Sequence, residues 1–476
     1  MLSQTVAPVA RAAAVGPAAT NGPRVVVVGA GLAGLTAAYR LRQAGIVASV
    51  VEASDRVGGR CWTIRGAFSD GQLAEHGGEL IDQGHTAIRQ LAQELGLGLD
   101  NLLAAEVNGT APLYWFDGAP YTYAQATTDV KAIWQQLHAD VSAAGYPTLF
   151  DNFTARGFEL DHMSITDWIA AYVPGGRASR LGRLLDIAYT IEYGAESSVQ
   201  SALNLLYLLA YSGQGQLRIF GPSNEKYRVS GGNDQIATRL AAALPRQIQL
   251  GSALVALRDN GNGTWQVTTR KGSKTTAVTA DHVILALPFS LLRDVDLTGA
   301  RFPALKRTAI RDLAMGANSK LHLQFTDRIW SQQGCNGDTF ADTGYQNTWE
   351  VTRAQPGRAG ILVDYTGGTI GNSFTGGTPA TFARRFLTQI EPVIPGISAT
   401  WNGRATLDHW PTNPWTKGSY SYWKIGQYTA FSGVEKLPVG SCHFAGEHTS
   451  QDFQGYLNGA VETGQRAATE ILTAIK

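Results

Sequence analysis

The stretch VVVVGAGLAGLTAAYRLRQAGIVASVVE, residues 25–52, contains in order a strand, a glycine-rich turn, a helix and a second strand. Its four consecutive valines are typical of a strand that is buried on both faces of a parallel sheet. Residues 35–43 predict a helix that ends at Gly45, and residues 48–52 predict the second strand. These parts make a βαβ unit of about 30 residues, which predicts an α/β fold built on a parallel sheet.

The three glycines of the turn meet three steric demands of a dinucleotide site. Gly29 allows the tight turn from strand to helix, Gly31 lets a pyrophosphate approach the backbone, and Gly34 lets the helix pack closely on the sheet. The helix N-terminus would then present free N–H groups to the phosphates. Glu52 ends the second strand, where a carboxylate can accept hydrogen bonds from a ribose diol. We therefore predict a dinucleotide-binding site.

A second glycine turn favours FAD over NAD as the dinucleotide. The segment RVGGR, residues 56–60, follows closely after Glu52. Beside Gly59, the guanidinium of Arg60 would reach the pyrophosphate from the other side with charge-assisted hydrogen bonds. A glycine loop with a surface arginine is the alternative, and this motif alone does not decide between the two.

Composition excludes several classes of protein. The chain has 476 residues, with 39 Lys+Arg against 38 Asp+Glu and a formal net charge of +1. Without a basic excess or a dense Lys/Arg run, no nucleic-acid partner is expected. No stretch approaches the roughly 18 to 20 apolar residues of a membrane span. The three cysteines have no spacing typical of a disulfide framework or a zinc site, so no metal is expected.

The order of the predicted elements indicates two interleaved domains. We expect a discontinuous Rossmann-type FAD-binding domain with an inserted mixed α+β substrate domain. Residues 1–23 are expected to form a disordered leader of a cytoplasmic protein, with export of that leader as the alternative. Further strands are predicted around 248–257, 265–269 and 282–287, and helices at 87–95, 127–144, 181–188, 201–211, 234–244 and 456–475. The expected boundaries are 24–85, 225–300 and 435–476 for the FAD-binding domain, and 86–224 and 301–434 for the substrate domain.

From these motifs outward, the sequence resembles the flavin-containing amine oxidase family, which includes monoamine, polyamine and L-amino acid oxidases. The resemblance covers most of residues 24–475. Beyond the motifs above, it rests on Gly77-Gly78, VSGG at 229–232, the strand through Leu254, AMGANSK at 314–320, FAGEHT at 444–449 and GYLNGAVETG at 455–464. It implies that FAD is the cofactor and that the residues in contact with it include Gly78, Leu254, Gly446, Glu447 and Leu457.

The resemblance also implies the reaction and its catalytic residues. Lys320 resembles the family lysine that reaches flavin N5 through a water, and Tyr420 and Tyr456 resemble the aromatic cage around the substrate nitrogen. A hydride would pass from the amine α-carbon to flavin N5, and O2 would regenerate the flavin with release of hydrogen peroxide. A solvated lysine and tyrosines packed in a core are the structural alternatives.

Ser419 departs from the pattern of the monoamine oxidases, in which a cysteine bonded to the flavin precedes the first cage tyrosine. A serine lacks the thiolate chemistry that this bond requires. Cys442 lies in a different strand context. We therefore predict that FAD is bound noncovalently.

Acidic residues indicate the substrate class. Asp82 and the segment IEYGAE, which contains Glu192 and Glu196, resemble two acidic segments of plant polyamine oxidases. A carboxylate about 4 Å from a distal ammonium is worth roughly 4 kcal/mol at an effective dielectric of 20, which favours a di- or polyamine. An α-amino acid would instead need an arginine for its carboxylate, and none occurs between Arg65 and Arg89.

We therefore predict an oxidase of small-molecule amines, with diamines or polyamines favoured over aromatic monoamines. An L-amino acid oxidase, or an FAD-dependent desaturase of the protoporphyrinogen or phytoene type, is the alternative. The sequence leaves the oligomeric state open, a homodimer included. Aromatic residues that could line a tunnel for an aromatic amine are Trp410, Trp415, Tyr422 and Trp423.

Overall fold

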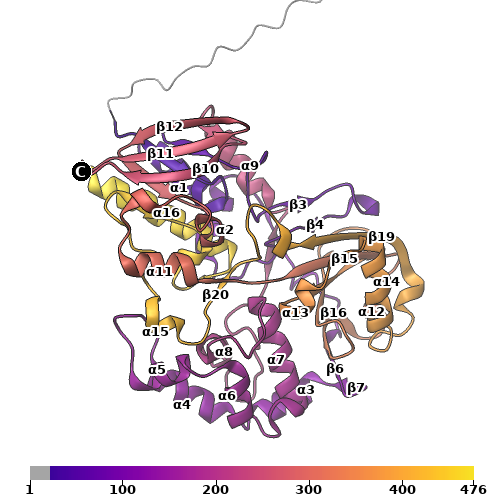
Figure 1. Ribbon diagram of the computed structural model, residues 1–476. Coiled ribbons are helices and arrows are strands. Elements are labelled where there is room, and N and C mark those ends of the chain that lie inside the picture. The colour runs from indigo at the N-terminus through magenta and orange to yellow at the C-terminus, as the bar shows by residue number, and fades with distance from the viewer. Residues whose placement is uncertain (1–21) are drawn as a thin grey trace, which may run out of the picture.

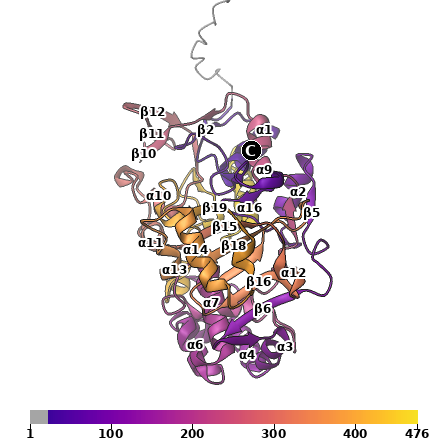
Figure 2. The same ribbon diagram turned by 90° about the vertical axis from the view of Figure 1, so that its right-hand side faces the viewer.

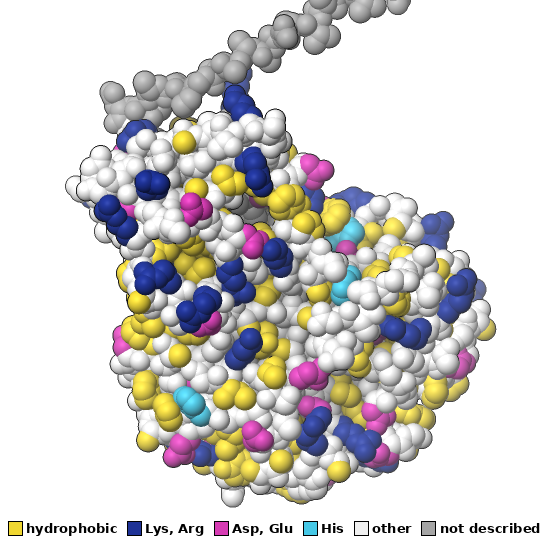
Figure 3. Space-filling model, viewed as in Figure 1, with side chains coloured by type: hydrophobic (Ala, Val, Ile, Leu, Met, Phe, Trp, Pro, Cys, Tyr) yellow, Lys and Arg dark blue, Asp and Glu magenta, His cyan; other side chains and the backbone are white. Residues whose placement is uncertain are grey.

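A parallel sheet and a larger mixed sheet organise the protein, as seen in a computed structural model that describes residues 22–476 (Figure 1). The leader expected at residues 1–23 lies outside the described residues, apart from Gly22 and Pro23. Among the described helices, none is long and apolar enough to cross a membrane. On the face shown in Figure 3, acidic and basic side chains are interspersed without a broad patch of one sign.

The valines of the βαβ unit form the central strand of the parallel sheet. Strand β1 (Val25–Val28) is buried along its whole length and pairs with its neighbours on both sides. Strands from distant parts of the chain complete the sheet, as predicted for a discontinuous domain. Its order is β21 (Cys442–Phe444), β13 (His282–Leu285), β1, β2 (Ser49–Val51) and β9 (Ile248–Gln249).

Two helices pack closely together over this sheet because glycines leave room for the backbone. Helix α1 (Leu32–Gln43) follows β1, and α16 (Leu457–Ala474) returns from the C-terminal region to lie against it (Figure 1). At Gly34 a Cβ atom would lie 1.9 Å from the oxygen of Gly29, so this glycine lets α1 pack on the turn after β1. At Gly464 a Cβ atom would lie 2.3 Å from the oxygen of Ala33, so that glycine lets α16 pack on α1. A larger residue at either position would push the helix outward.

The second sheet belongs to the region expected to bind substrate. Its seven strands include β15 (Ser319–Phe325), every residue of which is buried. Figures 1 and 2 show a helical group beneath this sheet and the three-stranded sheet β10 (Ala253–Asp259), β11 (Trp265–Lys271) and β12 (Lys274–Ala280) at the opposite end of the molecule. The helices of the group are α3 (Tyr123–Val130), α4 (Trp134–Ala144), α5 (Ala155–Asp161), α6 (Ile165–Tyr172), α7 (Arg180–Tyr193) and α8 (Ala202–Leu209).

The fold class is therefore confirmed: a Rossmann-type α/β sheet carries an inserted α+β region. The domain boundaries stay a prediction.

Two predicted elements are corrected. The helix expected at 127–144 is broken into α3 and α4, although Val130, Ile133 and Leu137 are all fully buried at helical spacing. The strand expected at 248–257 is divided at Gly251, whose φ of 68° is left-handed, so that β9 and β10 join different sheets.

Candidate active site

A cavity of about 1180 Å³ extends from the carboxyl ends of β1 and β2 to the seven-stranded sheet. Residues of both sheets line it, together with parts of α7 and the first turn of α16. Ligands of open α/β sheets bind beyond the carboxyl ends of the strands. The fold and the glycine motif therefore indicate the same binding site.

The glycine turn is shaped for a phosphate group. A Cβ atom at Gly29 would lie 2.6 Å from the oxygen of Ala286, whereas at Gly31 there is open space. Helix α1 has no side-chain cap and no acidic residue in its first turn, so its first N–H groups are available to an anion. These features fit the pyrophosphate of a dinucleotide.

Glu52, the predicted ribose contact, lines the cavity and is held by its neighbours. Its Oε2 accepts a hydrogen bond from the backbone N–H of Ala30 at 2.7 Å, and its Oε1 accepts from the N–H and the hydroxyl of Ser54, both at 2.8 Å. The predicted contact Leu254 also lines the cavity. The carboxylate thus joins the turn to the second strand while it faces the cavity.

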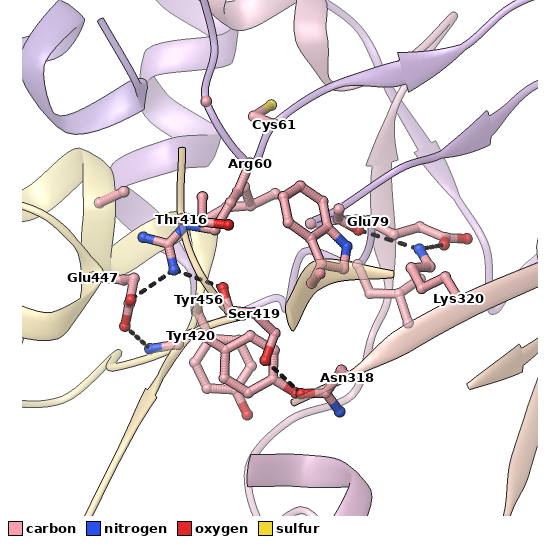
Figure 4. A pocket seen from close by; sticks show the side chains of 18 of the residues that line it. Arg60, Cys61, Glu79, Asn318, Lys320, Thr416, Ser419, Tyr420, Glu447 and Tyr456 are labelled. Atoms are coloured by element: carbon pink, nitrogen blue, oxygen red, sulfur yellow. Dashed lines mark hydrogen bonds and ion pairs between the residues drawn. The ribbon is translucent and has the colours of Figure 1, made fainter. Parts of the chain in front are cut away.

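Arg60 and Glu447 both line the cavity and form an ion pair with each other (Figure 4). Nη1 of Arg60 donates to Oε1 of Glu447 at 2.7 Å and to the backbone oxygen of Ser419 at 2.7 Å. Burial opposes ionisation of Glu447, but Arg60 and His448 outweigh it, so its pKa lies below the ordinary value. The arginine predicted to hold pyrophosphate therefore also ties the C-terminal block to the first glycine loops.

Lys320 projects from β15 toward the cavity and binds a carboxylate that sequence reasoning missed (Figure 4). Its Nζ donates to Oε2 of Glu79 at 2.8 Å and to the backbone oxygens of Glu75 at 2.9 Å and Gly77 at 3.2 Å. Both side chains are almost fully buried. The segment of the predicted contact Gly78 is thereby fixed against the sheet, and a Cβ atom there would lie 2.6 Å from the side chain of Leu457.

Tyr420 and Tyr456 both line the cavity, and hydrogen bonds hold both hydroxyl groups. The hydroxyl of Tyr420 lies 2.6 Å from that of Tyr365. The hydroxyl of Tyr456 donates to Oε1 of Glu192 at 3.0 Å. Gly455, which precedes Tyr456, has a φ of 87°, a backbone conformation that favours glycine. Both tyrosines therefore reach the cavity, as the cage hypothesis requires.

Three residues predicted to contact substrate do not line the cavity. Asp82 accepts hydrogen bonds from the turn at residues 223–225. Oε1 of Glu196 accepts from the N–H of Thr369 at 2.7 Å, away from the cavity. Trp423 is 5% exposed and packs in the core. The sequence pattern identified acidic and aromatic positions but could not show where their side chains point.

The cavity contains acids that the pattern did not single out. Glu192 was predicted and lines the cavity, whereas Glu106, Glu225 and Asp338 were missed and also line it. Burial raises the pKa of Glu192 to about 7, against the lowering effect of the hydrogen bond from Tyr456. These acids come from distant segments without a shared motif, so only the tertiary structure shows that they line one cavity.

Comparisons with known proteins agree with this geometry. The family described as flavin containing amine oxidoreductase matches residues 32–472. The chain belongs to this family. As a flavin-containing amine oxidoreductase, the protein uses FAD, and the glycine turn, the uncapped helix and Glu52 fit that cofactor.

Individual relatives of this amine oxidoreductase cover nearly the whole chain. It is 26% identical over 464 residues to amine oxidase [flavin-containing] A of Sus scrofa, covering 95% of this chain and 85% of the relative. It is 29% identical over 470 residues to the putative flavin-containing monoamine oxidase AofH of Mycobacterium tuberculosis (strain ATCC 25618 / H37Rv), covering 95% and 98%. A solved structure of putrescine oxidase bound to putrescine has the same fold, with a TM-score of 0.79, 22% identity and coverage of 95% and 99%.

Proposed function

We propose that this amine oxidoreductase acts on diamines or polyamines in preference to aromatic monoamines, with O2 as the electron acceptor. The observation that carries the proposal is the position of Glu192, which lines the cavity 3.0 Å from the hydroxyl of cage residue Tyr456. A carboxylate there would attract a second positive charge on the substrate. The similar fold of putrescine oxidase bound to putrescine supports a diamine.

The chain's own residues would position the amine and control its charge. The chemistry that FAD supplies when bound is acceptance of a hydride from the amine α-carbon and transfer of the electrons to O2. Tyr420 and Tyr456 would flank the reacting nitrogen. A buried ammonium can lose about 3 to 5 pKa units by desolvation, more than a cation–π contact of ~0.5 to 2 kcal/mol restores. The buried surroundings of Tyr420 and Tyr456 would thus favour the neutral amine that the reaction needs.

Lys320 would act beside the reacting centre as a fixed ammonium group. Its three hydrogen bonds to Glu79 and to two backbone oxygens leave it little freedom of movement. To orient a water molecule, as the family lysine does, it would exchange its longest hydrogen bond, the one of 3.2 Å to the backbone oxygen of Gly77. Lys320 is therefore proposed to position a water and not to bind the substrate.

The first test is anaerobic reduction of the purified flavoprotein by a panel of amines. Putrescine, cadaverine and spermidine should bleach the flavin at lower concentrations than n-butylamine or tyramine, because they carry a second charge. Bleaching by tyramine but by none of the diamines would contradict the proposed substrate class.

An L-amino acid oxidase is a second candidate because Arg218 lines the cavity. Among residues 22–476, its guanidinium has no hydrogen-bond or ion-pair partner, so it could accept a substrate carboxylate. Arg218 lies outside the segment between Arg65 and Arg89, whose lack of arginine counted against an α-amino acid substrate. Flavin reduction by L-lysine but not by cadaverine, which lacks only the carboxylate, would favour this candidate.

FAD is proposed to be noncovalent because Ser419 has no thiol to bond the flavin. Its hydroxyl instead donates to Oδ1 of Asn318 at 2.5 Å (Figure 4). Acid precipitation of the protein should leave all of the yellow colour in the supernatant. A yellow pellet would contradict noncovalent binding.

A further inference from the structure

Asp82 fixes a turn that borders the cavity. Its Oδ1 accepts hydrogen bonds from the hydroxyl of Ser223 at 2.9 Å and from the backbone N–H groups of Asn224 at 2.9 Å and Glu225 at 2.6 Å. Its Oδ2 lies 3.1 Å from Nε2 of His85. The side chain is almost fully buried, so these bonds are protected from water. Asp82 therefore determines the conformation of residues 223–225.

This turn presents Glu225 to the cavity in an uncommon backbone conformation. The φ of Glu225 is 49°, in the left-handed region that residues other than glycine rarely adopt. Such a conformation persists where the surroundings over-determine it, and here the bond to Asp82 does so. Ser223 and Asn224 line the cavity beside it. The direction of the Glu225 side chain is thus set by the turn.

The carboxylate of Glu225 lacks a counter-charge of its own. Among residues 22–476 it has no hydrogen-bond or ion-pair partner, although it lines the cavity. Desolvation by the surrounding protein raises its pKa to about 8, and repulsion from Asp338, Asp82 and Glu192 adds to this. The residue still has accessible surface, and it lines the cavity. Arg353 is near enough to oppose that effect, but its guanidinium already donates to Oδ1 of Asp338 at 2.5 Å.

Glu192 lines the same cavity but, unlike Glu225, has a hydrogen-bond partner. Glu192 already accepts the hydrogen bond of Tyr456, whereas Glu225 is free to bind a ligand cation. We infer that Glu225 binds the distal ammonium group of a diamine or polyamine, and that Asp82 is a positioning residue that directs Glu225 into the cavity. This inference rests on the proposed function and adds Glu225, as the group that binds the distal ammonium, to Glu192, which attracts the same charge from the side of the cage.

The test compares each α,ω-diamine of a homologous series, from putrescine upward, with the n-alkylamine of the same length. The variant Glu225→Gln keeps the size of the side chain and removes its charge. Above about pH 8, where Glu225 is ionised, we expect the KM of the preferred diamine to rise about tenfold, because one ion pair in the cavity is lost, while the KM of the matched monoamine stays within about twofold. The kcat values should change little, since Glu225 is proposed to bind only the distal group.

Glu159→Gln is the matched control. Glu159 lies on α5 with its side chain 61% exposed, so the variant removes the same charge from outside the cavity. Its KM values should equal those of the wild type for every amine. Melting temperature and flavin absorbance of each variant verify that fold and cofactor are intact.

A double-variant cycle tests the role of Asp82. In Asp82→Ala, the hydroxyl of Ser223 and the N–H groups of Asn224 and Glu225 lose their common acceptor, which loosens the turn. We expect Asp82→Ala to raise the KM of diamines selectively and to have no further effect when Glu225→Gln is already present. A merely structural role would instead lower kcat for diamines and monoamines alike, and additive effects on KM would overturn the assignment.

The outcomes separate this inference from the proposed function. If Glu225→Gln changes diamines and monoamines equally, or neither, Glu225 is not the ammonium site, although diamine oxidation by the wild type leaves the proposed function in place. If no amine reduces the wild-type flavin, the proposed function fails and this inference fails with it.

Discussion

Lys320 illustrates at the scale of a single residue how one ammonium group can serve both stability and activity. The variant Lys320→Met would leave the carboxylate of Glu79, which is 5% exposed, without its cation. An uncompensated buried charge of this kind costs about 3–5 kcal/mol. We therefore expect a large fall in melting temperature together with a loss of amine oxidation.

The double variant Lys320→Met/Glu79→Gln separates the two effects. It contains no uncompensated charge, so thermal unfolding should recover most of the stability, while anaerobic flavin reduction should stay slow because the ammonium is still missing. Full recovery of the reduction rate would show that Lys320 acts only as a structural partner of Glu79.

Glu192 leads to a prediction about pH. Its pKa is raised to about 7, mainly by burial, so the carboxylate is charged above that pH and neutral below it. The ratio of kcat/KM for putrescine to that for n-butylamine should therefore rise between about pH 6 and pH 8, since the ratio largely cancels deprotonation of the reacting amine. Because Glu225, whose pKa is raised to about 8, titrates nearby, the profile is measured in Glu225→Gln.

Tyr456→Phe provides the check on this assignment. The hydrogen bond from Tyr456 lowers the pKa of Glu192, so its removal should move the rise in the ratio to higher pH. A ratio that is independent of pH, or a profile that Tyr456→Phe leaves in place, would contradict titration of Glu192.

At the scale of elements, the contact between α1 and α16 connects helix packing to the cofactor site. In Gly464→Ala the new Cβ atom would lie 2.3 Å from the oxygen of Ala33, so α16 must move outward. Overpacking of this kind costs typically about 1–3 kcal/mol. Because the first turn of α16 carries the cavity residue Leu457, FAD should also bind more weakly. Thr469→Ala, at an exposed position of the same helix, should change neither melting temperature nor FAD affinity.

The elements also show what could be predicted from sequence. The unit at residues 25–52 was predictable because strand, turn and helix are specified by neighbouring residues and their periodicity. The break between α3 and α4 was not, because Val130, Ile133 and Leu137 continue the apolar spacing across it. Local pattern therefore gives the existence of an element more reliably than its ends.

The same limit applies to the candidate site. Gly29, Gly31 and Glu52 could be named because their roles depend on a short motif that folds locally. Asp82 was predicted to bind substrate, but its carboxylate binds a turn more than a hundred residues away in sequence. Glu225 belongs to that turn, and no local pattern in the sequence shows that the turn borders the cavity. Only tertiary structure decides which of two acids faces the cavity.

At the scale of the whole molecule, the cavity is lined by residues from segments throughout the chain, from Val28 to Ala460. FAD would therefore bind to both the parallel sheet and the larger sheet, and its binding should stabilise the folded protein as a unit. A ligand at a hundred times its Kd adds about 2.7 kcal/mol to the free energy of unfolding. We expect the melting temperature of the apoprotein to rise with FAD concentration, and riboflavin, which lacks the pyrophosphate and adenosine, to produce a clearly smaller rise. Equal rises for the two compounds would mean that the glycine turn and the N-terminus of α1 do not contribute to binding, because only FAD carries the phosphates that those N–H groups can bind.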